Sequence, residues 1–548
     1  MKKSILKPSL DLGHSLLDIG HSSPPVLRSV SIVSAMTAIS RFGGLIREMA
    51  MAYFFGTSAL KSAFDIAFIV PNLFRRLFGE GALSSAFVPV FSETLEKEGR
   101  EQARLLAMRL ITLLALVLGV ITLGGILLSY PIERMLPSDS RWLLPMPMLR
   151  IMLPYALLIC VAALVGGMLN TLGRFGISSF TPFLLNFIWI LTLVGIFPFL
   201  RDDPDFRVIV LSWAILFAGL AQILFQIPTL HRHGFHFRLY FSGIFKDPRL
   251  MRVLILMGPA ALGMGIIQVN VCVDKLLAYW ADASAPAALE YAERIVYLPL
   301  GMFGTAFMTV LLPTFSRLAT RNDLPAMRQT LERAMRNMML IMAPCSAGLM
   351  VLAYPCIEVI YSMKGGAFNE ESTLLSARAL AAYAPGLLVF SFQKALTPAF
   401  YGMQDLKTPL RVSLYVLVLN LAFNVASVIL LPTGWKHVGI AGSTVLCSAV
   451  NGFVLALILR RKIGAPCASG TLGTLAKVVI FATLMAAIAF GTHTLLTQWL
   501  GTHKIAQIIS MLGAVLVGAA VYGGMTFAFA RRELMEMVGE FRARRKDK

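Results

Sequence analysis

Long apolar segments recur along almost the whole chain, and short polar stretches separate them. From Val26 onward, each run of about 20 or more mainly apolar residues can cross the roughly 30 Å hydrocarbon core of a bilayer as a helix. We therefore predict an all-α polytopic membrane protein with 14 transmembrane helices. The predicted segments are 26–55, 59–82, 105–130, 145–172, 179–200, 208–230, 250–280, 286–313, 335–361, 374–402, 408–431, 438–459, 472–495 and 505–530.

The two ends of the chain differ from this pattern. Residues 1–25 mix apolar residues with charges and histidines, and they lack the uninterrupted apolar core of a secretory signal peptide. We interpret them as a cytosolic N-terminal extension. Residues 531–548 are rich in Arg and Lys and are expected to form a basic cytosolic tail.

A short sequence similarity indicates an internal repeat. FVPVFSE (87–93) resembles LLPTFSR (311–317), and each follows a proline-containing apolar segment, IVPNLFRR or VYLPLGMF. The second and eighth segments are then equivalent. This predicts two six-helix lobes, 26–230 and 250–459, with two helices (472–530) appended, a plan that transporters commonly use.

Composition excludes the soluble classes of protein. Hydrophobic residues make up 57% of the chain and charged residues only 14%, whereas soluble domains average about 45–50% and about 25%. A water-soluble body of this composition would expose large apolar patches and aggregate. The cysteines form no CxxC pair, so neither a disulfide framework nor a zinc site is indicated.

The net charge of +20 indicates topology rather than nucleic-acid binding. The basic residues lie mostly between apolar runs, and alternate loops hold most of them, as the positive-inside rule requires of cytoplasmic loops. An even number of spans preserves this bias along the whole chain. We therefore expect both termini in the cytoplasm and no nucleic-acid partner.

Ionisable residues inside the predicted spans are the candidate functional residues. A charge at the centre of a membrane helix costs about 2.5–3.5 kcal/mol on insertion scales, so it usually faces a cavity. Arginines from three segments predict a cationic chamber between the lobes, and guanidinium groups bind phosphate oxygens in a bidentate manner. An anionic, phosphorylated substrate fits such a chamber. The charged residues concerned are Arg41, Arg47, Arg75, Arg76, Glu80, Glu290, Glu293 and Arg294.

Simpler interpretations of these arginines remain open. Arg75 and Arg76 lie near a segment end and could extend to the cytoplasmic interface. Arg47 could form a structural ion pair with Glu48 or Asp65.

A second polar set predicts a cation site. Asp274 lies in the seventh segment, and Asn420 and Asn424 are spaced i, i+4 and therefore share one helix face. With Thr444 of the twelfth segment they offer oxygen ligands that suit sodium. Three alternatives stay open: the asparagines link helices by hydrogen bonds, Asp274 pairs with Lys275 or with a neighbouring helix, or Asp274 carries a proton.

Four motifs together identify a family. SRFGGLIRE, AFDIAFIVPNLFRRLFGEGALSSAFVPVFSE, YAERIVYLPLGMFG and FYGMQDLKTP resemble the MurJ (MviN) family of lipid II flippases, in the multidrug/oligosaccharidyl-lipid/polysaccharide exporter superfamily. The resemblance runs from about Ser31 to Arg461. It implies a MATE-like fold of 14 helices in two lobes around a cationic cavity, with a groove for the polyprenyl tail near the last two helices (472–530).

The resemblance also assigns roles. It places the family's essential arginines on Arg41, Arg47, Arg75 and Arg294, and we expect Arg76, Glu80, Asp65 and Glu293 to support them. Relatives usually carry an acidic residue where this chain has Ser62, with Asp65 one turn later. This difference leaves the role of the acidic position open.

These observations lead to an expected function. We expect a non-enzymatic flippase in the bacterial inner membrane that moves lipid II to the outer leaflet by alternating access. The sequence has no GxxxxGK[ST], HExxH or GxSxG motif. We therefore expect no cofactor, with sodium or a proton as the candidate coupling ion, or the membrane potential as the driving force. Expected partners are lipid II, membrane lipids and, as candidates, the cell-wall synthesis proteins.

Two other classes of function are alternatives. One is a multidrug or O-antigen-type lipid exporter; export of cationic drugs would favour an acidic cavity, and the arginines argue against it. A membrane glycosyltransferase would need carboxylates on long loops, and no long loop is present.

Overall fold

The computed structural model describes residues 24–79, 82–464, 469–531 and 535. Within these ranges the chain is helical and contains no strand. The predicted terminal extensions, 1–25 and 531–548, lie almost wholly outside the described residues, as does Glu80. The α-helices are α1 (Pro24–Phe55), α2 (Ala59–Phe74), α3 (Ala82–Lys97), α4 (Arg100–Met135), α5 (Pro145–Thr171), α6 (Phe175–Ile190), α7 (Pro204–Arg232), α8 (Pro248–Ala281), α9 (Ala285–Pro299), α10 (Thr305–Thr320), α11 (Leu324–Val351), α12 (Ala353–Tyr361), α13 (Glu370–Tyr383), α14 (Gly386–Gly402), α15 (Lys407–Leu430), α16 (Lys436–Ile463), α17 (Ser469–Leu500) and α18 (Lys504–Phe529).

Every predicted segment coincides with helix. Ten described helices are long and apolar enough to span a membrane, or twelve when each bent pair is counted as one span. These twelve spans do not include α1 or α2. α1 carries Arg41 and Arg47, and Arg75 directly follows α2. The all-α membrane fold is confirmed, and the count of 14 crossings is consistent with it.

Two spans bend where the sequence contains proline. α8 bends by 47° just after Pro259, and α13 and α14 meet at 43° beside Pro385. Proline removes a backbone donor and interrupts the helical hydrogen bonds, which neighbouring helices can compensate inside a membrane.

The repeated sequence corresponds to a repeated local structure. After α2, the π-helical turn η1 (Arg75–Gly79) precedes α3; after α9, the π-helical turn η6 (Leu300–Gly304) precedes α10. α3 was not predicted as a separate helix. The prediction failed there because the short helix ends in a charged stretch, which lowers its mean hydropathy. The order helix, π-turn, helix supports the inferred repeat.

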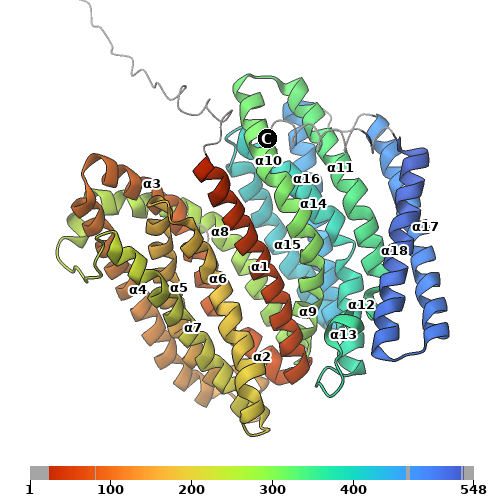
Figure 1. The fold of residues 1–548 in the computed structure, drawn as a ribbon, viewed down its shortest axis with the longest axis horizontal. Helices are drawn as coiled ribbons and strands as arrows, with labels where there is room; N and C mark the ends of the chain where they lie inside the picture. Colours follow the sequence, from red (N-terminus) through yellow and green to blue (C-terminus); the bar gives the residue numbers. More distant parts are fainter. Residues whose placement is uncertain (1–23, 80–81, 465–468, 532–534, 536–548) are drawn as a thin grey trace, which may run out of the picture.

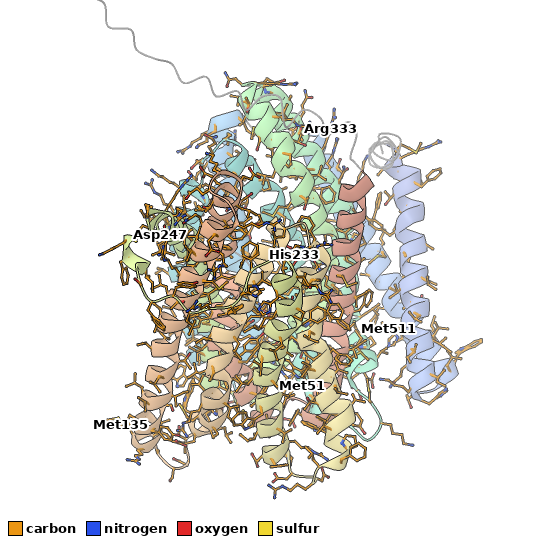
Figure 2. All side chains as sticks on the ribbon, turned by 60° about the vertical axis from the view of Figure 1, so that its left-hand side comes forward. Met51, Met135, His233, Asp247, Arg333 and Met511 are labelled. Carbon is orange, nitrogen blue, oxygen red and sulfur yellow. The ribbon has the colours of Figure 1, made fainter. Side chains whose placement is uncertain are left out.

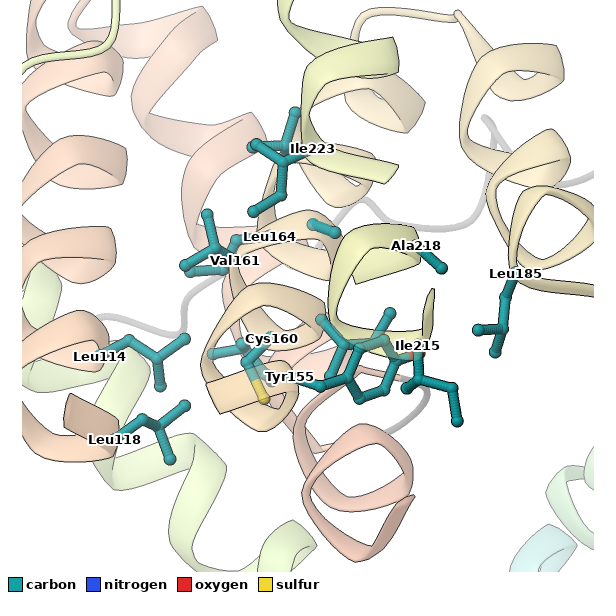
Figure 3. Close-up of a cluster of buried hydrophobic side chains, with 14 of the residues drawn as sticks. Leu114, Leu118, Tyr155, Cys160, Val161, Leu164, Leu185, Ile215, Ala218 and Ile223 are labelled. Carbon is teal, nitrogen blue, oxygen red and sulfur yellow. The ribbon is translucent and has the colours of Figure 1, made fainter. Parts of the chain in front are cut away.

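The helices form two groups with α1 between them (Figure 1). The first group is built on an apolar core that includes Leu114 of α4, Tyr155 of α5, Leu185 of α6 and Ile215 of α7 (Figure 3). At the end of α1, Met51 belongs to this core, whereas the next residue, Ala52, belongs to the core of the second group. α1 therefore contacts both groups.

α8 also connects the two groups. Near its start, Arg249 and Arg252 donate to Glu98 and Glu93 of the α3 end at 2.8 Å each. Near its other end, Asp274 accepts a hydrogen bond from α15 at 2.5 Å. The division into lobes at residues 26–230 and 250–459 stays a prediction.

The last two helices lie at the edge of the bundle (Figure 1). α17 packs on α11 through apolar side chains such as Val478 and Ala482, against Met339 and Ala343. The hydroxyl of Tyr522 on α18 donates to the Leu340 carbonyl at 2.9 Å.

The two groups are joined where α1 turns into α2. The Ala367 amide donates to the Tyr53 carbonyl at 2.7 Å, and the Tyr291 hydroxyl donates to the Gly56 carbonyl at 3.0 Å. Gly56 has φ +55°, and a Cβ there would lie 2.5 Å from the Ala367 oxygen. Only glycine fits both constraints. Figure 2 places Met135 and Arg333 at opposite ends of the bundle.

The FYGMQDLKTP motif forms a tight turn between α14 and α15. Asp405 accepts hydrogen bonds from the amide and hydroxyl of Thr408, at 3.0 and 2.7 Å, and from Lys462 of α16. Burial raises the pKa of Asp405, but the hydrogen bonds from Lys462 and Thr408 outweigh burial and lower that pKa to about 2. This motif therefore stabilises a helix connection.

Candidate functional site

A buried carboxylate lies between arginines from the two groups of helices. Glu48 on α1 is 2% exposed, and its Oε1 accepts hydrogen bonds from Arg47 Nη2 at 2.5 Å and Arg294 Nη2 at 2.9 Å. Arg294 comes from α9, 246 residues later. The two predicted arginines are thus brought together, and Arg47 forms the ion pair with Glu48 that was one of the alternatives.

The glycine pair of α1 makes room for this arrangement. A Cβ on Gly44 would lie 3.8 Å from Arg294 Nη1, and one on Gly43 would lie 3.6 Å from Asn186 Cβ. α1 is continuous through the pair, so Gly43 and Gly44 permit close approach of α9 and α6.

α6 holds Arg47 from the other side. Arg47 Nη1 donates to Asn186 Oδ1 at 3.1 Å, and the guanidinium carbon lies 4.3 Å from the ring centroid of Trp189. Asn186 Nδ2 donates in turn to the Ser40 carbonyl at 3.1 Å. These contacts orient the guanidinium through a hydrogen bond and a cation–π interaction. Sequence reasoning missed Asn186, although a lone amide within FLLNFIW was a usable signal.

Further ion pairs surround this centre. Lys61 Nζ contacts both carboxylate oxygens of Asp65 at 2.6 Å, and Lys275 of α8 pairs with Glu290 of α9. Arg294 lies 3.8 Å from the same Glu290. Asp65 therefore pairs with Lys61, and the alternative pairing of Arg47 with Asp65 was wrong.

Ser62 links the two groups directly. Its Oγ is buried and accepts a hydrogen bond at 3.3 Å from the Ala287 amide, in the first turn of α9. First-turn amides lack partners within their own helix, so an oxygen from α2 satisfies one of them. A serine can therefore occupy this position without a counter-charge.

The remaining arginines divide between two neighbouring places. Arg75 Nε donates to Asn72 Oδ1 at 3.0 Å, and Arg76 Nη1 donates to Gln268 Oε1 of α8 at 3.2 Å. Both are half-buried. Arg41 lies against η6, because a Cβ on Gly301 would be only 2.6 Å from Arg41 Nη1.

The predicted cation-site residues meet in the second group. Asn424 Nδ2 donates to Asp274 Oδ1 at 2.5 Å and to Asn420 Oδ1 at 3.0 Å, and the Ser443 hydroxyl donates to Asn424 Oδ1. Thr444 is adjacent to the same carboxylate. The sequence missed Ser443.

These residues partly suit a hard monovalent cation. The candidate ligands are oxygens, one of them a carboxylate. Asn270 Nδ2 donates to Asp274 Oδ2 at 3.4 Å, and the buried Oδ1 of the same asparagine has no hydrogen-bond partner among the described residues. Among the described residues no group of three His, Cys, Asp or Glu could hold a metal. Carboxylate and amide oxygens are ligands of the kind that hard cations prefer.

Comparison with known proteins gives a consistent result. The model of the family "Lipid II flippase MurJ" matches residues 51–510. The chain is 31% identical to a probable lipid II flippase MurJ of Rickettsia prowazekii, covering 92% of this chain and 97% of that one. A probable lipid II flippase MurJ of Vibrio cholerae is also 31% identical, covering 91% and 95%.

Solved structures share the fold. A lipid II flippase MurJ in an inward closed conformation has a TM-score of 0.72 at 22% identity, over 92% of this chain and 99% of that one. An inward-facing multidrug resistance MATE transporter has a TM-score of 0.64 at 16% identity, over 80% and 98%.

Two groups of membrane helices joined by a buried arginine–carboxylate cluster define a helical membrane protein with the fold that the solved MurJ and MATE structures share. Within that class, the length and identity of the matches decide the family. The chain belongs to the MurJ family.

Proposed function

We propose that this multi-pass inner-membrane protein is a lipid II flippase, which moves the lipid-linked peptidoglycan precursor from the cytoplasmic to the outer leaflet. The observation that carries the proposal is the convergence of Arg47 of α1 and Arg294 of α9 on the buried Glu48. Family membership supports the substrate.

The substrate's diphosphate is the group that these arginines bind. Guanidinium forks pair with phosphate oxygens through two hydrogen bonds each, which makes such contacts strong and directional. Glu48 occupies Arg47 and Arg294 in the absence of substrate, so the diphosphate replaces one anion with another. Arg41 and Arg75 complete the set, while Arg76, Asp65 and Glu293 support it.

Alternating access requires the joined end of the molecule to open. The contacts of Tyr53 with Ala367 and of Gly56 with Tyr291 close the end at which α1 meets α2. The positive-inside rule makes this the outer side and puts both termini in the cytoplasm. Labelling of cysteines placed at Asp202, Lys364 and Lys436 should occur from outside the cell, and cytoplasmic labelling of any of them contradicts this topology.

We also propose two accessory sites. Asp274, with Asn420, Asn424 and Thr444, binds a coupling cation, sodium or a proton, and Asp274→Asn should abolish the response of flipping to sodium or pH. The α17–α18 pair carries the polyprenyl tail along its lipid-facing side, since this pair is attached mainly through α11. An exporter of cationic drugs fits less well, because the arginines would repel its substrate.

Complementation of a bacterium depleted of its own flippase tests the main proposal. Alanine at Arg41, Arg47, Arg75 or Arg294 should abolish growth at normal protein levels, and lysine should rescue only in part because an ammonium lacks the fork. Arg201→Ala, at a residue 68% exposed in its side chain, is the matched control. Failure of the unmodified protein to complement or to relieve lipid II accumulation refutes the function.

A further inference from the structure

The linker that leads from α7 into α8 carries exposed apolar side chains that the proposed function does not use. It comprises residues 233–247, whose first and last residues are labelled in Figure 2. Leu239, Phe241 and Phe245 of this linker are 55%, 62% and 77% exposed. Single apolar side chains on a surface are ordinary, but large ones gathered this closely indicate an interaction surface.

Other side chains of the linker fix it to the first group of helices. Phe235 is 1% exposed, and its ring centroid lies 5.8 Å from that of Phe91 on α3. Ile244 is also buried and belongs to the apolar core of the first group. The linker therefore has a packed face and an exposed apolar face, and the exposed face is held in a defined position.

Contacts with α4 set the depth of the linker in the membrane. The Tyr240 amide donates to Thr112 Oγ1 at 3.0 Å, and Arg104 Nη2 donates to the Tyr240 hydroxyl at 2.9 Å. Residues 110–132 of α4 include no charged residue, and at 1.5 Å per residue they extend about 35 Å, enough to cross the hydrocarbon core. Thr112 lies in the first turn of this apolar stretch, and Arg104 lies before it. The linker is thus at the boundary between headgroups and hydrocarbon, where aromatic side chains are favoured.

Basic side chains beside the exposed apolar ones are not balanced by carboxylates. Arg238 and Lys246 are exposed, and within the described ranges neither forms an ion pair. The one carboxylate of the linker, Asp247, is buried and already pairs with Arg109 at 2.8 Å and Arg249 at 2.9 Å. A surface that is both apolar and cationic is typical of segments that lie in the membrane interface and bind acidic lipids.

We propose that the exposed face of this linker binds acidic phospholipids of the surrounding bilayer. Phe241 and Phe245 enter the interface, and Arg238 and Lys246 hold the negatively charged headgroup. The inference goes beyond the proposed function, because it concerns bilayer lipid on the outside of the first group and not the substrate between the two groups. One basic residue near an acidic membrane surface should change lipid binding about fivefold.

Photocrosslinking of the full-length protein tests this surface, in nanodiscs of equal parts phosphatidylglycerol and phosphatidylcholine. The photoreactive p-benzoylphenylalanine replaces Phe245, and mass spectrometry identifies the lipid attached to the protein. Phosphatidylglycerol adducts should exceed phosphatidylcholine adducts about fivefold or more. The same photoreactive residue in place of Phe217, which is 61% exposed in the middle of α7, is the matched control and should capture both lipids equally. Arg238→Gln combined with Lys246→Gln should return the ratio at position 245 to that of the control.

The two parts of the proposal fail on different results. If position 245 captures no lipid while position 217 does, the linker does not enter the interface. Equal capture of both lipids at position 245 overturns the binding of acidic phospholipid. The photoreactive residue in place of Asn322, in the exposed turn between α10 and α11, should capture no lipid, and capture there as strong as at position 245 also overturns the insertion. The flippase proposal is unaffected by these results, because the nanodiscs contain no lipid II. Size-exclusion chromatography checks that the variants fold.

Discussion

Replacing Glu48 with glutamine should loosen the connection between the two groups of helices. Gln keeps the shape of the side chain but removes the charge that Arg47 and Arg294 share. The hydrogen bonds of the two guanidinium groups then lose their ionic component, and two like charges remain side by side. The expected result is a less stable protein whose two groups of helices separate more readily.

The structure sets the size of the effect. A hydrogen bond to a charged group contributes about 1.5–3 kcal/mol. The Arg47 side chain is 12% exposed and should account for about 2 kcal/mol. Arg294 is 32% exposed, so solvent screens its contact and about 1 kcal/mol is reasonable. Together they predict a loss of about 3 kcal/mol, a change of roughly a hundredfold in the unfolding equilibrium.

Reversible unfolding of the purified protein in mixed micelles measures this loss through tryptophan fluorescence. Glu48→Gln, Arg294→Gln and the double variant form a cycle in which the effects should be less than additive, because both remove the same contact. Glu96→Gln, at an exposed glutamate of α3, should change stability by less than about 0.5 kcal/mol. The reasoning is refuted if Glu48→Gln behaves like this control or if the two effects simply add.

Three further predictions follow from the packing. Asp65→Asn leaves Lys61 buried without a counter-charge and should cost about 3–5 kcal/mol, whereas the apolar pair Lys61→Met/Asp65→Leu should recover most of it in the same unfolding assay. Gly56→Ala should destabilise by more than Gly99→Ala, since both glycines have positive φ but only the first meets another backbone; equal losses would contradict the close approach. Asp405→Asn should lower thermal stability at pH 7. Because folding depresses the Asp405 pKa from 3.8 to about 2, this difference is present above about pH 4 and should vanish as pH falls through 2; a pH-independent difference would be contrary to this.

The internal repeat was only partly visible in the sequence. The repeat was visible as FVPVFSE and LLPTFSR, but its structural content, a π-turn between two helices, was not. A π-turn has no composition of its own, since it depends on how the flanking helices pack. The separate helix α3 was missed for a different reason, because its charged end lowers its mean hydropathy.

The sequence by itself determined the class of protein and the location of its spans. A bilayer requires about 20 apolar residues for each crossing and satisfaction of every backbone group, so hydropathy alone locates the membrane spans. It also identified several residues whose charge is costly in a membrane, but not Lys61 or Lys275, although the four-residue spacing of Lys61 and Asp65 was a local signal of their pairing.

Only the tertiary structure decided which charges meet. Arg294 reaches Glu48 across 246 residues, and Arg47 reaches Asn186 across 139. Hydropathy reports the cost of each charge separately, whereas pairing depends on the orientation of helices from both halves of the chain. Which arginines hold a carboxylate is therefore a property of the fold, because the cost of a charge in a membrane depends on the groups packed around it.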